Sequence, residues 1–255
     1  MKKVALILLL SFNIIKVFSQ VDKIKSNSDS NSNNSSKTED VSSPCMASCG
    51  DACFNSIAQA CFDFAITGML ELNKTYVDNK DDIPIVTSID FMTQGAYHPA
   101  NTMLILPRIR GNWGLFSTDV RFNSMIEITS KGSDFYNTFD WQMLQLNLLV
   151  TKPVILRLGT GFMYENYSKS FFNEHSLGIS FFMDDYKYRI DNEFRFAKDY
   201  NTSNIPRLEG STVFNYAILQ TSKLDGYISL GVMYENYYLD VPIWSVIGGM
   251  AFNFH

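Results

Sequence analysis

The chain has 255 residues, a formal net charge of −5 and many aromatic residues, with 20 Phe, 13 Tyr and 3 Trp. Only 21 residues are Lys or Arg, and they form no basic run, which argues against a nucleic-acid partner. Beyond the N-terminal segment, no apolar run reaches the ~18 residues that a membrane-spanning helix needs. Any membrane-spanning part of this chain must therefore be built from strands.

The N-terminus has the pattern of a secretory signal peptide. Lys2 and Lys3 give it a positive start, and the run from Val4 to Phe18 is almost entirely apolar. Ser19 and Gln20 end this run at the expected place for cleavage. We therefore predict that residues 1–20 are a signal peptide and that the chain is exported.

Two different segments follow the predicted signal peptide. Residues 21–43 are dominated by Ser, Asn and Thr with charges, a composition that predicts a flexible linker. Ser43 and Pro44 then have the pattern of a helix start, with Ser at the N-cap and Pro at the first helical position. The apolar spacing predicts one amphipathic helix over residues 44–73.

Four cysteines lie along one face of this predicted helix: Cys45, Cys49, Cys53 and Cys61. An even number of cysteines in an exported protein suggests disulfides. However, Cβ atoms four residues apart on a helix are about 5–6 Å apart, whereas a disulfide needs about 3.5–4.5 Å. Three interpretations stay open: disulfides in a locally broken helix, a thiolate metal site, or small apolar residues at a helix interface. We predict that the helix docks in the periplasm, onto the barrel or a partner protein, with no metal bound.

The period of the pattern changes to two after Pro84, which predicts strands. In segment 115–129, Phe122 and its apolar neighbours alternate with Arg121 and other polar residues. A slip in the alternation of segment 135–150 predicts a β-bulge near Met143. The ten predicted strands are 84–97, 102–110, 115–129, 135–150, 153–167, 174–184, 187–198, 208–222, 226–239 and 242–254.

Two features favour a membrane barrel over a soluble one. Short connections alternate with longer, more polar ones, as in outer-membrane barrels. Arg occupies the predicted inward face while Lys stays at turns, and the planar guanidinium suits a confined ion-pair network. We predict that this network in the lumen consists of Arg108, Arg110, Asp119, Arg121, Glu127, Asp140, Arg157, Glu165, Arg189, Asp191, Glu193, Arg195 and Glu235.

The C-terminus supplies a third feature. Gly249, Phe252 and Phe254 lie in a final strand with alternating aromatics, and this segment resembles the C-terminal assembly signal of outer-membrane barrel proteins. In pattern, residues 84–255 resemble small bacterial outer-membrane β-barrel proteins of the poorly characterised Bacteroidota type. The resemblance implies an antiparallel up-and-down barrel of about ten strands (eight if the first pair lies outside it) in the outer membrane of a Gram-negative bacterium. It also implies contact with outer-membrane lipid and the barrel assembly machinery, with both chain ends of the barrel in the periplasm.

An internal repeat places Glu165 and Glu235 in matching Tyr-Glu-Asn-Tyr segments, 70 residues apart in the sequence. The repeat indicates either a paired acidic site near the barrel mouth or, as we favour, two strands that use the same residues to meet the same packing requirement. The best candidate for a catalytic triad consists of His175, the adjacent Glu174, and Ser168 or Ser170, which lie a few residues earlier in the sequence. Adjacent strand residues face opposite ways, which argues against a triad.

We therefore predict a non-enzymatic barrel without cofactors, with a closed charged lumen and a structural or interaction role. A narrow pore is the first alternative, and a barrel enzyme acting on lipids or peptides at the outer rim is the second. A barrel of this size has room for side chains rather than a wide channel.

Overall fold

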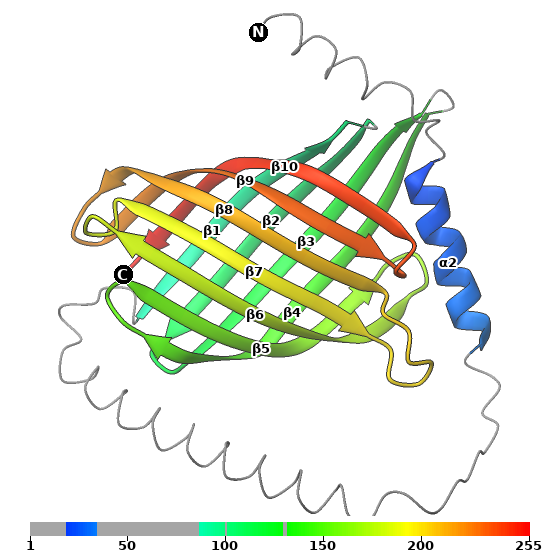
Figure 1. Cartoon of the computed structure of the whole chain (residues 1–255), viewed down its shortest axis with the longest axis horizontal. Helices are drawn as coiled ribbons and strands as arrows, with labels where there is room; N and C mark the ends of the chain where they lie inside the picture. Colours follow the sequence, from blue (N-terminus) through cyan, green and yellow to red (C-terminus); the bar gives the residue numbers. More distant parts are fainter. Residues whose placement is uncertain (1–18, 35–86, 100, 130–131) are drawn as a thin grey trace, which may run out of the picture.

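The computed structural model describes residues 19–34, 87–99, 101–129 and 132–255 (Figure 1). This part of the chain forms one helix and ten strands. The helix is α2 (Gln20–Asn34). The strands are β1 (Thr87–His98), β2 (Thr102–Trp113), β3 (Phe116–Thr129), β4 (Gly132–Val150), β5 (Val154–Glu165), β6 (Ser170–Met183), β7 (Tyr188–Lys198), β8 (Arg207–Gln220), β9 (Leu224–Tyr237) and β10 (Val241–Phe254).

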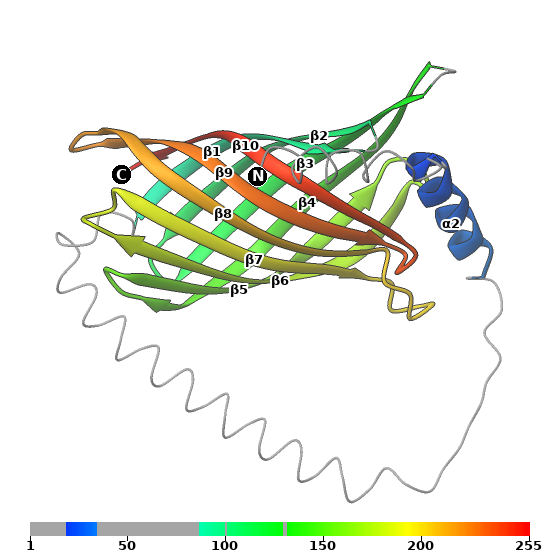
Figure 2. The same ribbon diagram turned by 45° about the horizontal axis from the view of Figure 1, so that its top comes forward.

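The ten strands form a closed antiparallel up-and-down barrel, as the sequence predicts. Each strand pairs with its neighbours in the sequence, and β1 pairs with β10 from Ile89 opposite Phe254 to Tyr97 opposite Val246. Because the number of strands is even, the start of β1 and the end of β10 lie at the same end of the barrel. Helix α2 lies at the other end (Figures 1 and 2). We call this end the α2 mouth.

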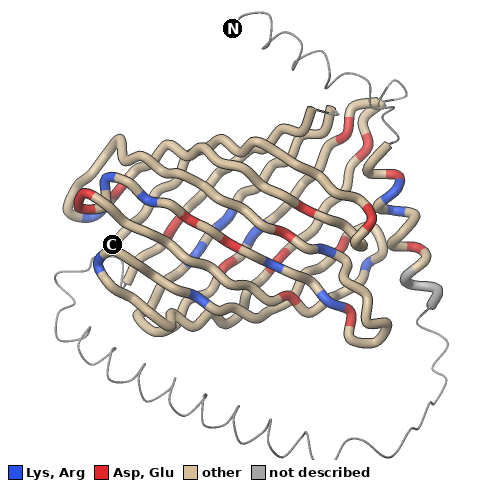
Figure 3. Tube along the Cα trace, viewed as in Figure 1, with Lys and Arg blue, Asp and Glu red and all other residues tan. Residues whose placement is uncertain are grey.

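The two faces of each strand have opposite character, because successive side chains point to opposite sides of a sheet. In β3, Arg121 is 5% exposed and points into the lumen, whereas the neighbouring Phe122 is 41% exposed on the outer wall. Charged positions run along the strands through the body of the barrel as well as at its ends (Figure 3). The barrel is thus polar inside and apolar outside, the inverse of a soluble barrel.

The inner face is not polar all round, which differs from the predicted charged lumen. One side of it carries an apolar cluster that includes Leu104, Met125, Met233, Ile243 and Ile247. Ile243 and Ile247 lie on the buried, inward face of β10, four residues apart. These side chains fill the part of the lumen that the ion pairs leave open.

The predicted bulge near Met143 is present. The pairing of β4 shifts register between Trp141 and Leu144, so Met143 and Leu144 both lie on the outer face, 57% and 44% exposed. The predicted alternation of short and long connections is largely absent, because β4 and β6 begin earlier than predicted and shorten the loops before them. Only residues 199–206, between β7 and β8, form a longer connection.

The segment predicted to be a flexible linker begins with a helix instead. Helix α2 occupies Gln20–Asn34 because the barrel buries one side of it: Val21 and Ile24 are 0% exposed and Ser28 is 1% exposed. Composition alone indicated no core for these residues, but packing against another element stabilises helices that are marginal alone.

The predicted helix over 44–73, its four cysteines and residues 1–18 of the predicted signal peptide lie outside the described residues. Within the described ranges, no helix is long and apolar enough to span a membrane.

Candidate functional site

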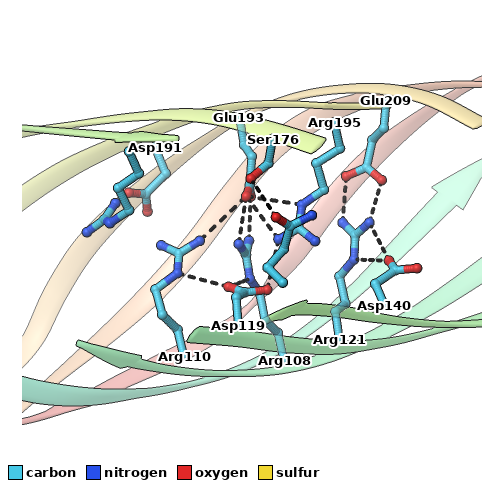
Figure 4. A network of polar contacts seen from close by, with 12 residues as sticks. Arg108, Arg110, Asp119, Arg121, Asp140, Ser176, Asp191, Glu193, Arg195 and Glu209 are labelled. Carbon is cyan, nitrogen blue, oxygen red and sulfur yellow. Dashed lines mark hydrogen bonds and ion pairs between the residues drawn. The ribbon is translucent and has the colours of Figure 1, made fainter. Parts of the chain in front are cut away.

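The candidate site is a network of ion pairs that crosses the lumen (Figure 4). Arg108 on β2 binds Glu193 on β7 through two guanidinium nitrogens, at 2.5 and 2.8 Å. In the ring of ten strands, β2 and β7 are five positions apart and therefore diametrically opposed. A bidentate contact of this kind fixes the distance between the two walls, because both groups are planar and directional.

A second crossing lies beside the first. Arg121 on β3 binds Glu209 on β8 at 2.5 and 2.6 Å, and these strands are also five positions apart. Arg121 also donates to Asp140 on the adjacent strand β4 at 2.8 Å. Arg207 on β8 reaches Asp140 from the far wall at 2.7 Å.

Arg195 connects the two crossings. It is 0% exposed and binds Asp119 at 2.8 Å and Glu193 at 2.9 Å, and one of its guanidinium nitrogens lies 3.6 Å from Glu174. Asp119 accepts from Arg108 at 2.7 Å and from Arg110 at 2.9 Å as well. These groups therefore act as one network in which each carboxylate neutralises more than one guanidinium.

The network leaves little free space in the lumen. The cavity beside it, lined by Arg108, Arg157 and Glu193 among others, has a volume of about 40 Å³. That volume holds one or two water molecules. The paired side chains therefore occupy the lumen beside this cavity.

Most residues of the predicted network lie where the sequence placed them. Arg189 binds Asp191 at 2.9 Å, and its second carboxylate neighbour is Asp90 at 3.6 Å. Arg157 points inward but binds Ser180 at 2.9 Å and forms no ion pair within the described residues. Glu127, Glu165 and Glu235 also point inward, yet they form hydrogen bonds at the α2 mouth in place of ion pairs.

Sequence reasoning missed three members of the network. Arg207 was assigned to a connection, although it precedes Glu209 by two residues and so shares its face. Glu174 was considered only as a partner for His175, but it is fully buried and binds Arg207 at 2.7 Å. The third member is Glu209. Glu174 and Glu209 lie within the predicted strands 174–184 and 208–222, and extension of the second strand by one residue adds Arg207 to the same face as Glu209.

Helix α2 seats on the acidic residues of the α2 mouth. The Glu127 carboxylate accepts from the backbone N–H of Gln20 at 3.0 Å, from that of Val21 at 2.8 Å and from the Ser19 hydroxyl at 2.9 Å. Farther along the helix, the Ser28 hydroxyl donates to Glu165 at 2.7 Å. Carboxylates at a helix N-terminus satisfy its free N–H groups and interact favourably with the helix dipole.

Lysines hold the exposed side of α2. Lys25 pairs with Asp134 and lies over the Tyr167 ring at 5.5 Å, and Lys23 pairs with Asp240 at 3.0 Å. Hydrogen bonds from Lys23 and Asn27 lower the pKa of Asp240. The contribution of this pair to seating is therefore complete above the ordinary pKa of Asp240, and it is lost as the pH falls through the lowered value.

The two glutamates of the internal repeat lie at the same mouth. Glu165 accepts hydrogen bonds from the hydroxyls of Tyr136 and Tyr238, and Glu235 accepts one from Tyr237 at 3.0 Å. The rings of Tyr136 and Tyr237 pack edge to face, with centroids 5.3 Å apart. The glutamates are thus connected through tyrosines and not to each other.

A glycine lies three residues before each Tyr-Glu-Asn-Tyr segment, and the same close approach of strands requires both Gly161 and Gly231. A Cβ atom at Gly161 would lie 1.9 Å from the Trp141 carbonyl oxygen, and one at Gly231 would lie 2.3 Å from that of Thr212. Neighbouring strands approach too closely at both places for any side chain. This supports the packing interpretation of the repeat.

The structure does not bring His175 together with the carboxylate and the serine that a catalytic triad requires. Glu174 points into the lumen, whereas His175 points outward and contacts Thr160 at 3.2 Å and the Tyr200 hydroxyl at 2.9 Å. Within the described part of the chain, neither a serine nor a carboxylate is hydrogen-bonded to His175. Nor do these residues contain a group of His, Cys, Asp and Glu arranged to hold a metal ion.

The predicted assembly signal forms the end of β10. Phe252 and Phe254 face outward, 38% and 45% exposed, and Phe254 packs edge to face on Phe91 with centroids 5.7 Å apart. Gly249 allows the backbone of β1 to approach, since a Cβ atom there would lie 2.3 Å from the Thr93 carbonyl oxygen. These residues therefore close the barrel between its last and first strands.

Comparison with known proteins gives likenesses at the level of the fold. No protein-family model and no curated protein matches the chain. Solved structures that are similar to it include the N-terminal β-barrel domain of Pseudomonas aeruginosa OprF, at 13% identity and a TM-score of 0.30, covering 66% of this chain and 98% of that one. The KdgM porin is similar at 14% identity and a TM-score of 0.32, covering 66% and 99%. A bacterial polysaccharide outer-membrane secretin is similar at 8% identity and a TM-score of 0.26, covering 66% and 72%.

Proposed function

We propose that this chain is a closed outer-membrane β-barrel with a structural or interaction role and no catalytic activity. The observation that carries the proposal is the network of ion pairs between opposite walls, with a cavity of about 40 Å³ beside it. A transport pore needs a continuous path, and here paired charges occupy the place where that path would run.

The outer wall supports placement in a membrane. Large apolar side chains cover it on every strand, with aliphatic residues such as Ile105, Leu230 and Val246 around its middle. Exposed aromatic residues lie near both ends of the barrel. They are Trp113, Phe116, Phe181 and Phe254 at one end, and Tyr97, Phe135, Phe171 and Trp244 at the α2 mouth. Two aromatic girdles around an apolar band are typical of barrels that span the outer membrane.

The orientation follows from the parity of the strands. Outer-membrane barrels with an even number of strands have both chain ends in the periplasm. The α2 mouth then faces the outside. On intact cells, we expect a membrane-impermeant amine reagent to modify Lys23, whose side chain is 48% exposed on the seated helix; protection of this residue until the membrane is broken would contradict the orientation.

Planar-bilayer recording separates the closed barrel from the narrow pore. We expect the purified, refolded protein to give no stable conductance steps, because the cross-lumen pairs occupy the place where a water path would run. A general porin inserted in the same bilayer serves as the positive control. Reproducible, ion-selective steps that depend on the folded barrel would contradict the closed-barrel proposal and favour the pore.

The seating of α2 gives a further prediction for the refolded protein. Ile24→Asp places a charge where a fully buried side chain packs, so α2 should leave the mouth and become a substrate for trypsin at Lys23 and Lys25. Ser26→Asp is the matched control, because Ser26 is exposed on the same helix. We expect cleavage to be faster in the first variant and unchanged in the second. Equal rates would show that α2 is not seated.

A further inference from the structure

Three buried carboxylates at the α2 mouth lack a cation. Glu127, Glu165 and Glu235 are at most 1% exposed, and none of them takes part in an ion pair of the described residues. The carboxylates deeper in the lumen differ, because Asp119, Asp140, Glu174, Glu193 and Glu209 each lie within 4.0 Å of an arginine. A buried charge without a partner is costly, so the mouth is built for a positive group that the barrel itself does not supply.

Glu127 differs from the other two in what it binds. Glu165 and Glu235 accept from hydroxyl groups, whereas both oxygens of Glu127 accept from backbone nitrogens, those of Gln20 and Val21. The helix N-terminus offers only a partial positive charge. The two lysines of α2 that point to this mouth are engaged elsewhere, by Asp134 and Asp240.

The backbone nitrogen of Gln20 belongs to the last residue of the predicted signal peptide, so a cut that frees this nitrogen lies one residue before the predicted boundary. We propose that the peptide bond between Ser19 and Gln20 is the cleavage site, and that the new α-ammonium group of Gln20 forms a buried ion pair with Glu127. Hydrolysis adds the hydroxyl of water to the Ser19 carbonyl carbon and its hydrogen to the Gln20 nitrogen, which then takes up a proton. This proposal rests on the export of the chain and deepens the proposed function.

The site is complete only after processing. In the uncut chain the Gln20 nitrogen is a neutral amide, and Ser19 occupies a contact to Glu127 at 2.9 Å. Cleavage removes Ser19, together with its hydroxyl contacts to Glu127 and to the backbone nitrogen of Asp22 at 3.1 Å. It gives a positive charge to the Gln20 nitrogen, which lies 3.0 Å from the carboxylate in the uncut chain. In the processed protein, Glu127 then binds α2 through this ion pair.

The test uses full-length protein expressed with its own leader and purified from membranes. Intact mass and N-terminal sequencing should give a chain that begins at Gln20 with a free amine. Acylation at neutral pH should modify this amine about tenfold more slowly in the folded protein than in Glu127→Gln, because an opposite charge raises an amine's pKa by about one unit. Glu235→Gln is the matched control at the same mouth, and it should react like the wild type.

A second comparison does not depend on the folding of a barrel variant. A chain engineered to begin at Ser19 carries its amine one residue away from Glu127, and this amine should react as fast as that of Glu127→Gln. A different first residue, a cyclised pyroglutamate terminus, or equal reaction rates in these forms would overturn the inference. The same samples run unheated and heated on a gel report barrel formation separately: a heat-modifiable band with a fast-reacting terminus overturns this inference and leaves the proposed function standing.

Discussion

Replacing Arg121 by Met should destabilise the barrel by about 3–5 kcal/mol, because removal of one member of a buried ion pair leaves the other charges uncompensated. Glu209 would keep only Arg207, whose nearest approach is 3.7 Å. Asp140 would retain its contact with Arg207 at 2.7 Å. The measurement is urea unfolding in detergent or lipid vesicles, followed by tryptophan fluorescence.

The double variant Arg121→Met, Glu209→Met tests the cause of this loss. If uncompensated charge is responsible, removal of both partners should cost less than removal of Arg121 alone, since two apolar side chains of similar size can replace an ion pair. A double variant that is less stable than the single one would show that Arg121 acts through packing. The closed network would then not be the source of the barrel's stability.

Replacing Phe122 by Arg should cost about 2–4 kcal/mol of barrel stability and strongly reduce insertion, because Phe122 lies on the outer wall at the middle of β3. Ile128→Arg is the matched control. Ile128 lies on the same strand and face, 54% exposed, but near the α2 mouth, where an arginine in a membrane barrel costs about 0–1 kcal/mol. Folding into lipid vesicles, measured by gel mobility and urea titration, gives both values.

The depth dependence distinguishes a membrane wall from a water-exposed one. In a soluble barrel both positions would face solvent, and both substitutions would have small and similar effects. Equal stability of Phe122→Arg and Ile128→Arg would therefore contradict placement in a membrane.

The fold was predictable from the sequence because a period of two is a local signal. Ten strands, their faces and the bulge near Met143 all follow from alternation within one strand. The ends of the strands were harder to predict, because the alternation of side chains does not show where the pairing between strands stops. Arg207 was missed for this reason, although Leu208 and Glu209 continue its alternation.

The contents of the lumen were only partly predictable. The alternation identifies which charged residues face inward. It does not identify their partners across the lumen, because the strands that lie opposite one another are set only when the ring of strands closes. Glu127 was assigned to the ion-pair network, whereas the structure places it at the N-terminus of α2. Helix α2 itself was taken for a linker, because the sequence does not show that the barrel mouth buries Val21 and Ile24.

Membrane fractions from cells that express the full chain, run on a gel unheated and heated, test most directly whether this chain forms a closed barrel in an outer membrane. We predict that the protein is in the outer-membrane fraction and migrates faster unheated than heated, because a closed barrel resists unfolding in detergent. Recovery in the soluble periplasmic fraction, or one mobility under both conditions, would contradict the account.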